Sequence, residues 1–136
     1  MENKIPQVLK EPRQQLTNRY NVSKFIVSTL LIALLSFVSG IFLPWWGIAL
    51  AAGIVGLIVP QRPSSAFFSG FLAIFLLWGL LAWSIDYPNE SILSRKIATI
   101  LPLGGSTFLL ILATALIGAL VGGLAALSGS YLKKSP

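Results

Sequence analysis

The amino-acid sequence predicts an all-α integral membrane protein, an antiparallel four-helix bundle with one short interfacial helix on its outer side. Four apolar runs follow one another between residues 25 and 127, and none of them contains a charged residue. Only 10% of the chain is charged and its mean hydropathy is +0.82, whereas soluble domains are about 25% charged. All eight prolines lie outside the runs or at their edges, which leaves each run free to form an unbroken helix.

The apolar runs define four predicted spans, at Phe25–Phe42, Trp45–Val59, Ala66–Ile85 and Phe108–Leu127. A spanning helix needs about 20 mainly apolar residues, and the second run is shorter than that. We expect this run either to cross by including Leu43 and Pro44, or to form a re-entrant or buried segment. The chain then divides into a loosely ordered basic N-terminal arm (1–24), a transmembrane domain (25–132) and a basic C-terminal tail (133–136).

The distribution of basic residues predicts the orientation. Eight of the ten lie in the N-terminal arm, the second connection and the C-terminal tail, while only Arg95 and Lys96 lie elsewhere. Four crossings place the first three segments on one side, and the excess of Lys and Arg marks that side as cytoplasmic. We therefore expect both termini in the cytoplasm.

Small residues share one face of the fourth span. They recur at helical spacing: Ala115, Gly118, Ala119, Gly122, Gly123 and Ala126. The second span repeats the pattern with Ala49, Ala52, Gly53 and Gly56. In lipid, helices associate where small residues let their backbones approach. These faces therefore predict either tight packing inside one chain or a seam with another copy or another protein.

The connection between the third and fourth spans predicts a short amphipathic helix from Ser91 to the proline at 102. Leu93, Ile97 and Ile100 fall on one side of it, and Arg95 and Lys96 on the other. We expect it to lie flat on the outer surface. There it either offers a docking surface to a partner or simply closes the loop over the bundle.

An aromatic stripe on the third span has two interpretations. Phe68, Phe71, Phe75 and Trp78 recur along this helix. Such a stripe either faces acyl chains or holds an apolar ligand.

The composition excludes most kinds of catalytic site. The chain has no histidine and no cysteine, so thiol nucleophiles, imidazole bases and zinc sites are absent. Its only carboxylates beyond the N-terminal arm are Asp86 and Glu90, in a connection that we expect to be wet, whereas acid–base catalysis needs groups with tuned pKa values. The sequence predicts no catalytic, cofactor-binding or metal site. Membrane lipids and other membrane-protein subunits, or a second copy, are the expected partners, and nucleic acid is not.

The last third of the chain resembles a group of known proteins. The stretches Leu101–Ser106 and Thr114–Leu127 resemble the corresponding part of small, uncharacterised four-span inner-membrane proteins of bacteria. The resemblance implies a bacterial inner membrane and no activity. Two other small four-span families do not fit, because multidrug transporters need a glutamate within the first span and dual-topology fluoride channels need balanced loop charges and an arginine within a span.

These observations favour a non-catalytic accessory or assembly subunit of a larger inner-membrane complex. Small-residue faces without a buried charge are suited to helix association and not to ion transfer. A first alternative is a small channel or carrier formed by an oligomer, with a path lined by Ser28, Thr29, Ser36, Ser39 and Thr114. A second is a lipid-interacting protein, which the basic arm favours.

Overall fold

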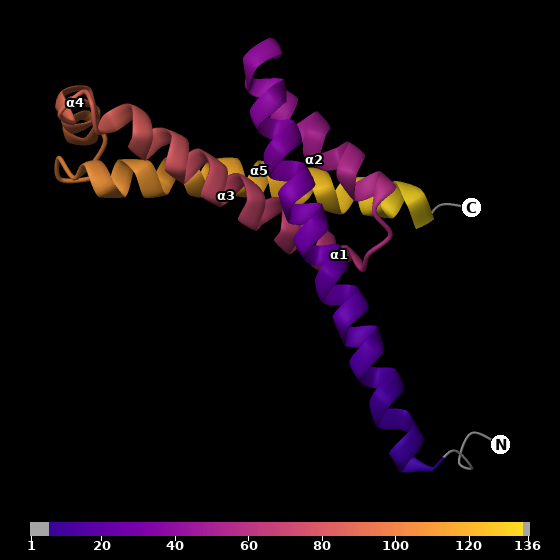
Figure 1. Ribbon diagram of the computed structural model, residues 1–136. Coiled ribbons are helices and arrows are strands. Elements are labelled where there is room, and N and C mark those ends of the chain that lie inside the picture. The colour runs from indigo at the N-terminus through magenta and orange to yellow at the C-terminus, as the bar shows by residue number, and fades with distance from the viewer. Residues whose placement is uncertain (1–5, 135–136) are drawn as a thin grey trace.

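The computed structural model describes residues 6–134 and, within them, five α-helices and no strand (Figure 1). The helices are α1 (Gln7–Phe42), α2 (Gly47–Ile58), α3 (Pro63–Asp86), α4 (Ile92–Ile100) and α5 (Thr107–Lys134). The predicted all-α class is confirmed for this part of the chain. Three helices, α1, α3 and α5, are long and apolar enough to cross a membrane. Residues 1–5, in the predicted arm, and 135–136, in the predicted tail, lie outside the described residues.

The second predicted span is shorter in the structure than in the sequence analysis. α2 has 12 residues, which rise about 18 Å against a hydrocarbon layer of about 30 Å. Proline bounds it on both sides: the Pro44 carbonyl accepts a hydrogen bond from Gly47 N at 2.8 Å, and Pro60 follows the end of the helix. Half of its residues are buried. α2 is therefore a half-buried helix that is too short to cross the hydrocarbon layer alone.

The prediction that the N-terminal arm is loosely ordered is wrong for the residues of the arm that the structure describes. Residues 7–24 form the first turns of α1, which continues without a break to Phe42. Extending an existing helix avoids the cost of nucleation and adds one backbone hydrogen bond per residue. Pro12 lies within the second turn, where it removes a single such bond. The helix therefore passes through residue 24 without a break, and all side chains from 11 to 23 are exposed.

The helices pack around α5. It lies against α3 and α2, and α1 contacts these same two helices from another side. Figure 1 shows α1 crossing the other helices steeply, with its N-terminal half standing clear of them. The core is formed by small and branched side chains of four helices, and these are Ile32, Ile48, Ala52, Val55, Ala73, Ile74 and Ala126.

The predicted short helix between the third and fourth runs is present as α4. The chain turns into it through Glu90 and Ser91, whose φ angles are +52° and +57°. The Asp86 carboxylate accepts hydrogen bonds from the hydroxyls of Ser91, at 2.6 Å, and Ser94. Asp86 is 9% exposed and is the last residue of α3, so the expectation of a wet loop is wrong for this carboxylate, whereas Glu90 is exposed. The hydrogen bonds of Asp86 fasten α4 to the end of α3.

We expect Gly122→Leu to destabilise the fold far more than Leu120→Ala. A Cβ atom at Gly122 would lie 3.0 Å from the Gly70 carbonyl oxygen and would run into the Ile74 side chain. Overpacking of this kind costs about 1–3 kcal/mol, whereas Leu120 is half exposed and its truncation opens no buried cavity. Thermal unfolding in detergent, followed by circular dichroism, measures both effects. An unchanged midpoint for Gly122→Leu would contradict the packing described here.

Candidate functional site

The small residues of α5 are occupied by contacts within the chain. All six that the sequence analysis selected are buried: Ala115, Gly118, Ala119, Gly122, Gly123 and Ala126. A Cβ atom at Gly118 would lie 2.7 Å from the Trp78 ring, and one at Gly123 would lie 2.9 Å from the Phe67 ring. These two contacts run in opposite order along α3 and α5. The stripe therefore faces α3 over several turns and is not open to a second molecule.

The small residues of α2 face α5 only in part. Ala52 and Gly56 are buried, and Gly56 packs directly against the backbone of Ala126. Ala49 and Gly53 are partly exposed. They line a shallow apolar hollow of about 380 Å³ between α2 and α5. Ala52 and Gly56 are thus covered, whereas Ala49 and Gly53 are partly open to the hollow, and the Gly53 backbone also faces Gly129 of α5.

The aromatic row in the structure shares two residues, Phe71 and Phe75, with the predicted stripe. Phe67, Phe71 and Phe75 form a continuous row, with ring centroids 5.9 Å and 6.2 Å apart. Phe68 is 60% exposed and meets only the edge of this row, and Trp78 packs against Gly118. Phe67 was missed, although the four-residue spacing of 67, 71 and 75 is visible in the sequence.

The two basic residues of α4 lie apart from these surfaces. Arg95 and Lys96 are both exposed, as are the apolar side chains of Leu93 and Ile100. α4 contacts α5, and its buried residue is Ala98. The helix therefore presents both an apolar and a basic surface to its surroundings.

A buried polar cluster, which the sequence analysis did not identify, joins α1 to α3. Gln61 Nε2 donates to Ser28 Oγ at 2.9 Å and to Ser69 Oγ at 3.2 Å. The two serine hydroxyls lie 3.3 Å apart, and Ser69 donates to the Ala66 carbonyl at 2.9 Å. Both serines are fully buried. No short-range pattern links residues 28, 61 and 69, so only the fold reveals the cluster.

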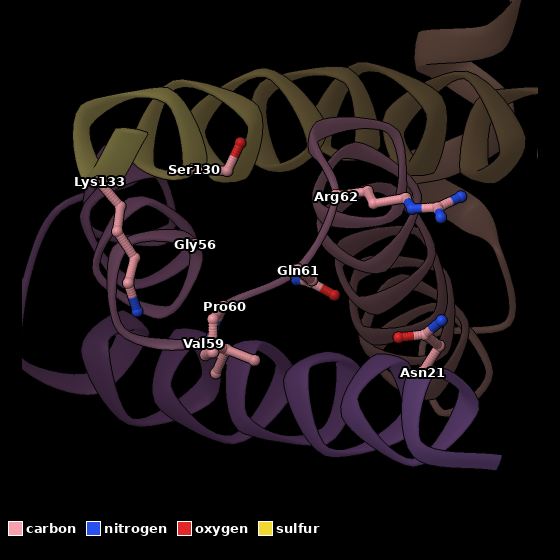
Figure 2. Close-up of a pocket in the computed structure, with 8 residues that line it drawn as sticks. All are labelled: Asn21, Gly56, Val59, Pro60, Gln61, Arg62, Ser130 and Lys133. Atoms are coloured by element: carbon pink, nitrogen blue, oxygen red, sulfur yellow. The ribbon is translucent and has the colours of Figure 1, made fainter. Parts of the chain in front are cut away.

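A basic cavity of about 400 Å³ opens beside this cluster. Its lining residues are Asn21, Gly56, Val59, Pro60, Gln61, Arg62, Ser130 and Lys133. Figure 2 shows α1 and α5 on opposite sides of it, with α2 and α3 between them and the linker that contains Gln61 running across. Lys133 Nζ donates to the Ile58 carbonyl at 3.2 Å, and Lys24 Nζ donates to the Pro60 carbonyl at 3.1 Å. Basic side chains from three segments therefore meet at one end of the molecule.

The chemistry of the described residues is that of packing and charge. Within residues 6–134, no group of three or more His, Cys, Asp or Glu side chains is arranged to hold a metal ion. Comparison of the chain with known protein families, with curated proteins and with solved structures finds no match. Inferences about function therefore begin from the geometry of the helices, the polar cluster and the basic cavity.

Proposed function

We propose that the protein is a non-catalytic accessory or assembly subunit of a larger complex in a bacterial inner membrane. In this proposal the chain crosses four times as an antiparallel bundle, with α2 completed by the residues that flank it and both termini in the cytoplasm. Lys24, Arg62 and Lys133, which come from three segments, lie around one cavity at one end of the molecule. This concentration of positive charge supports a cytoplasmic position for that end and for both termini.

The exposed N-terminal half of α1 is the observation that carries the proposal. Residues 11–23 continue the helix with every side chain exposed, over about 20 Å at 1.5 Å per residue. Leu16 and Tyr20, one turn apart, are 67% and 61% exposed. Continuity with the apolar part of α1 lets this segment form a helix, but tertiary packing normally supplies most of the stability of a helix in a protein. A partner subunit that covers this face would provide the contacts that the chain itself lacks.

The channel alternative finds little support in the hydroxyl groups proposed to line a path. Thr29 donates to the Phe25 carbonyl at 2.8 Å, and Thr114 donates to the Leu110 carbonyl at 2.9 Å. Ser28 belongs to the Gln61 cluster, and Ser39 donates to the Ser36 carbonyl at 3.0 Å. Four of the five hydroxyls are thus bound to protein atoms, whereas a wet path needs groups that can replace the hydration shell of a solute.

Co-purification tests the accessory-subunit proposal. We expect the protein, isolated in mild detergent, to retain a membrane-protein partner in a fixed ratio. Leu16→Asp combined with Tyr20→Asp should remove the partner, because charge would replace the apolar face of α1. Leu93→Asp combined with Ile100→Asp on α4 is the matched control and should leave the ratio unchanged. Equal retention by both variants would exclude α1 as the contact.

Single-cysteine labelling tests the topology. The chain has no cysteine, so Asn18→Cys, Glu90→Cys and Lys133→Cys each introduce one unique thiol. In intact cells, an impermeant thiol reagent added outside should label position 90 and spare 18 and 133, because four crossings place the basic end in the cytoplasm. Labelling of 18 or 133, or protection of 90, would contradict the orientation.

A flux measurement separates the subunit from the channel. We expect the purified protein in liposomes to pass no ions or small solutes, because charge transfer through an apolar helix bundle is prohibitive. The channel alternative requires a flux that falls when Ser36 or Thr114 is replaced by leucine. A reproducible flux with that sensitivity would overturn the accessory-subunit proposal.

A further inference from the structure

We propose that the basic cavity binds the phosphate headgroup of an anionic membrane lipid. The proposal concerns the cavity lined by Arg62 and Lys133 and does not depend on the role of α1 or on a partner subunit. It requires only that the apolar helices lie in a membrane.

The charge around the cavity is of one sign. Arg62 and Lys133 line it, and Lys24 is held beside it through the Pro60 carbonyl. The carboxylates among the described residues are those of Glu11, Asp86 and Glu90. Asp86 ends α3 and Glu90 follows it, so both lie at the end of this helix that is far from Arg62. Glu11 lies ten residues before Asn21 on α1, about 15 Å along the helix.

The basic side chains have hydrogen-bond donors to spare. An ammonium group carries three N–H donors and a guanidinium carries five. Lys133 donates one bond to the carbonyl of Ile58, the last residue of α2, and Lys24 donates one to the Pro60 carbonyl. Donors remain on both ammonium groups for a phosphate oxygen. Arg62 is exposed, and its planar fork matches the geometry of a phosphate.

The start of α3 adds to the positive potential of the cavity. Arg62 occupies the position before the first residue of α3, and no side chain caps the amides of the first turn. Uncapped amides at a helix N-terminus carry partial positive charge and attract anions. This contribution supplements the two side chains that line the cavity.

The polar cluster holds the cavity wall in place. Gln61 lies between Pro60 and Arg62, and its amide group is bound to the buried hydroxyls of Ser28 and Ser69. This fastens the linker to α1 and α3, so Arg62 projects from a fixed backbone. Figure 2 shows the side chains of Asn21, Gln61, Ser130 and Lys133 placed around the opening between the four helices.

The position of the cavity favours a lipid over a free anion. Lys24 directly precedes the apolar part of α1, and Arg62 directly precedes α3. Lys133 lies at the other end of an apolar helix, one residue before α5 ends. Basic residues at the ends of apolar helices lie at the level of lipid headgroups, and basic pockets between such helices bind anionic headgroups.

Native mass spectrometry of the full-length protein in detergent tests the proposal. The probes are phosphatidylglycerol and phosphatidylcholine with the same acyl chains. We expect the wild-type protein to retain phosphatidylglycerol in preference to phosphatidylcholine. Arg62→Gln combined with Lys133→Gln should weaken that binding roughly 30-fold, since each basic residue near the surface contributes about fivefold.

Two further variants make the result decisive. Arg95→Gln combined with Lys96→Gln removes the same charge from α4 at the far end of α3 and should leave the binding unchanged. Arg62→Lys combined with Lys133→Arg keeps the charge and should retain most of the binding. Helix content by circular dichroism should match the wild type throughout, because Arg62 and Lys133 are exposed.

Three outcomes would overturn the proposal. Equal losses in the two glutamine variants would show general attraction to a basic protein and not a site. Equal retention of the two lipids would exclude headgroup recognition. Displacement of the lipid by excess inorganic phosphate, with phosphate binding lost in Arg62→Gln/Lys133→Gln, would assign the cavity to a free anion.

Discussion

Contact between helix backbones at glycine positions is the interaction on which the rest of the structure depends. Hydrocarbon offers helices no hydrophobic reason to associate, so close approach and dispersion must hold them together. At Gly56, Gly70 and Gly129 the nearest atoms to an added Cβ belong to the backbone of the facing helix. All three contacts involve α5, which therefore serves as the common support for α2 and α3. A side chain at any of these positions would separate two helices, and its effect would reach the whole core.

α1 is less buried than the other long helices, and the glycine contacts that hold α2 and α3 against α5 do not include it. α1 contacts α2 and α3. Its side-chain hydrogen bonds to other segments are made by Ser28, in the Gln61 cluster, and by Lys24. In the most apolar 18-residue stretch of α1, 17% of the residues are buried, compared with 28% in the corresponding stretches of α3 and α5. The serine pair and Gln61 give α1 a fixed register on α3 without extensive burial. α1 is therefore positioned by the bundle and remains largely available to lipid or to a partner.

The two ends of the molecule differ in chemistry. One end gathers basic side chains from α1, from the linker before α3 and from α5 around a cavity. The other end carries α4, which is fastened by Asp86 and exposes apolar side chains beside Arg95 and Lys96. The first arrangement is suited to holding an anion, whereas the second is suited to lying in an interface between water and lipid. This asymmetry links the proposed orientation to the proposed headgroup site.

Composition and periodicity alone determined that the chain is helical and apolar, that a short helix separates the last two apolar runs, and that one face of the last run is small. These are local properties: charge-free runs, proline at their edges and a repeat of three and four residues. The sequence also bounded α2, because Pro44 and Pro60 flank it, and the structure shortens the predicted run by only Trp45, Trp46 and Val59. The composition of residues 7–24 did not predict their helical state, which follows from their continuity with an apolar helix. The Gln61 cluster and the basic cavity were decided only by the tertiary structure, because they unite residues 28, 61 and 69, or 21, 62 and 133, that no sequence period relates.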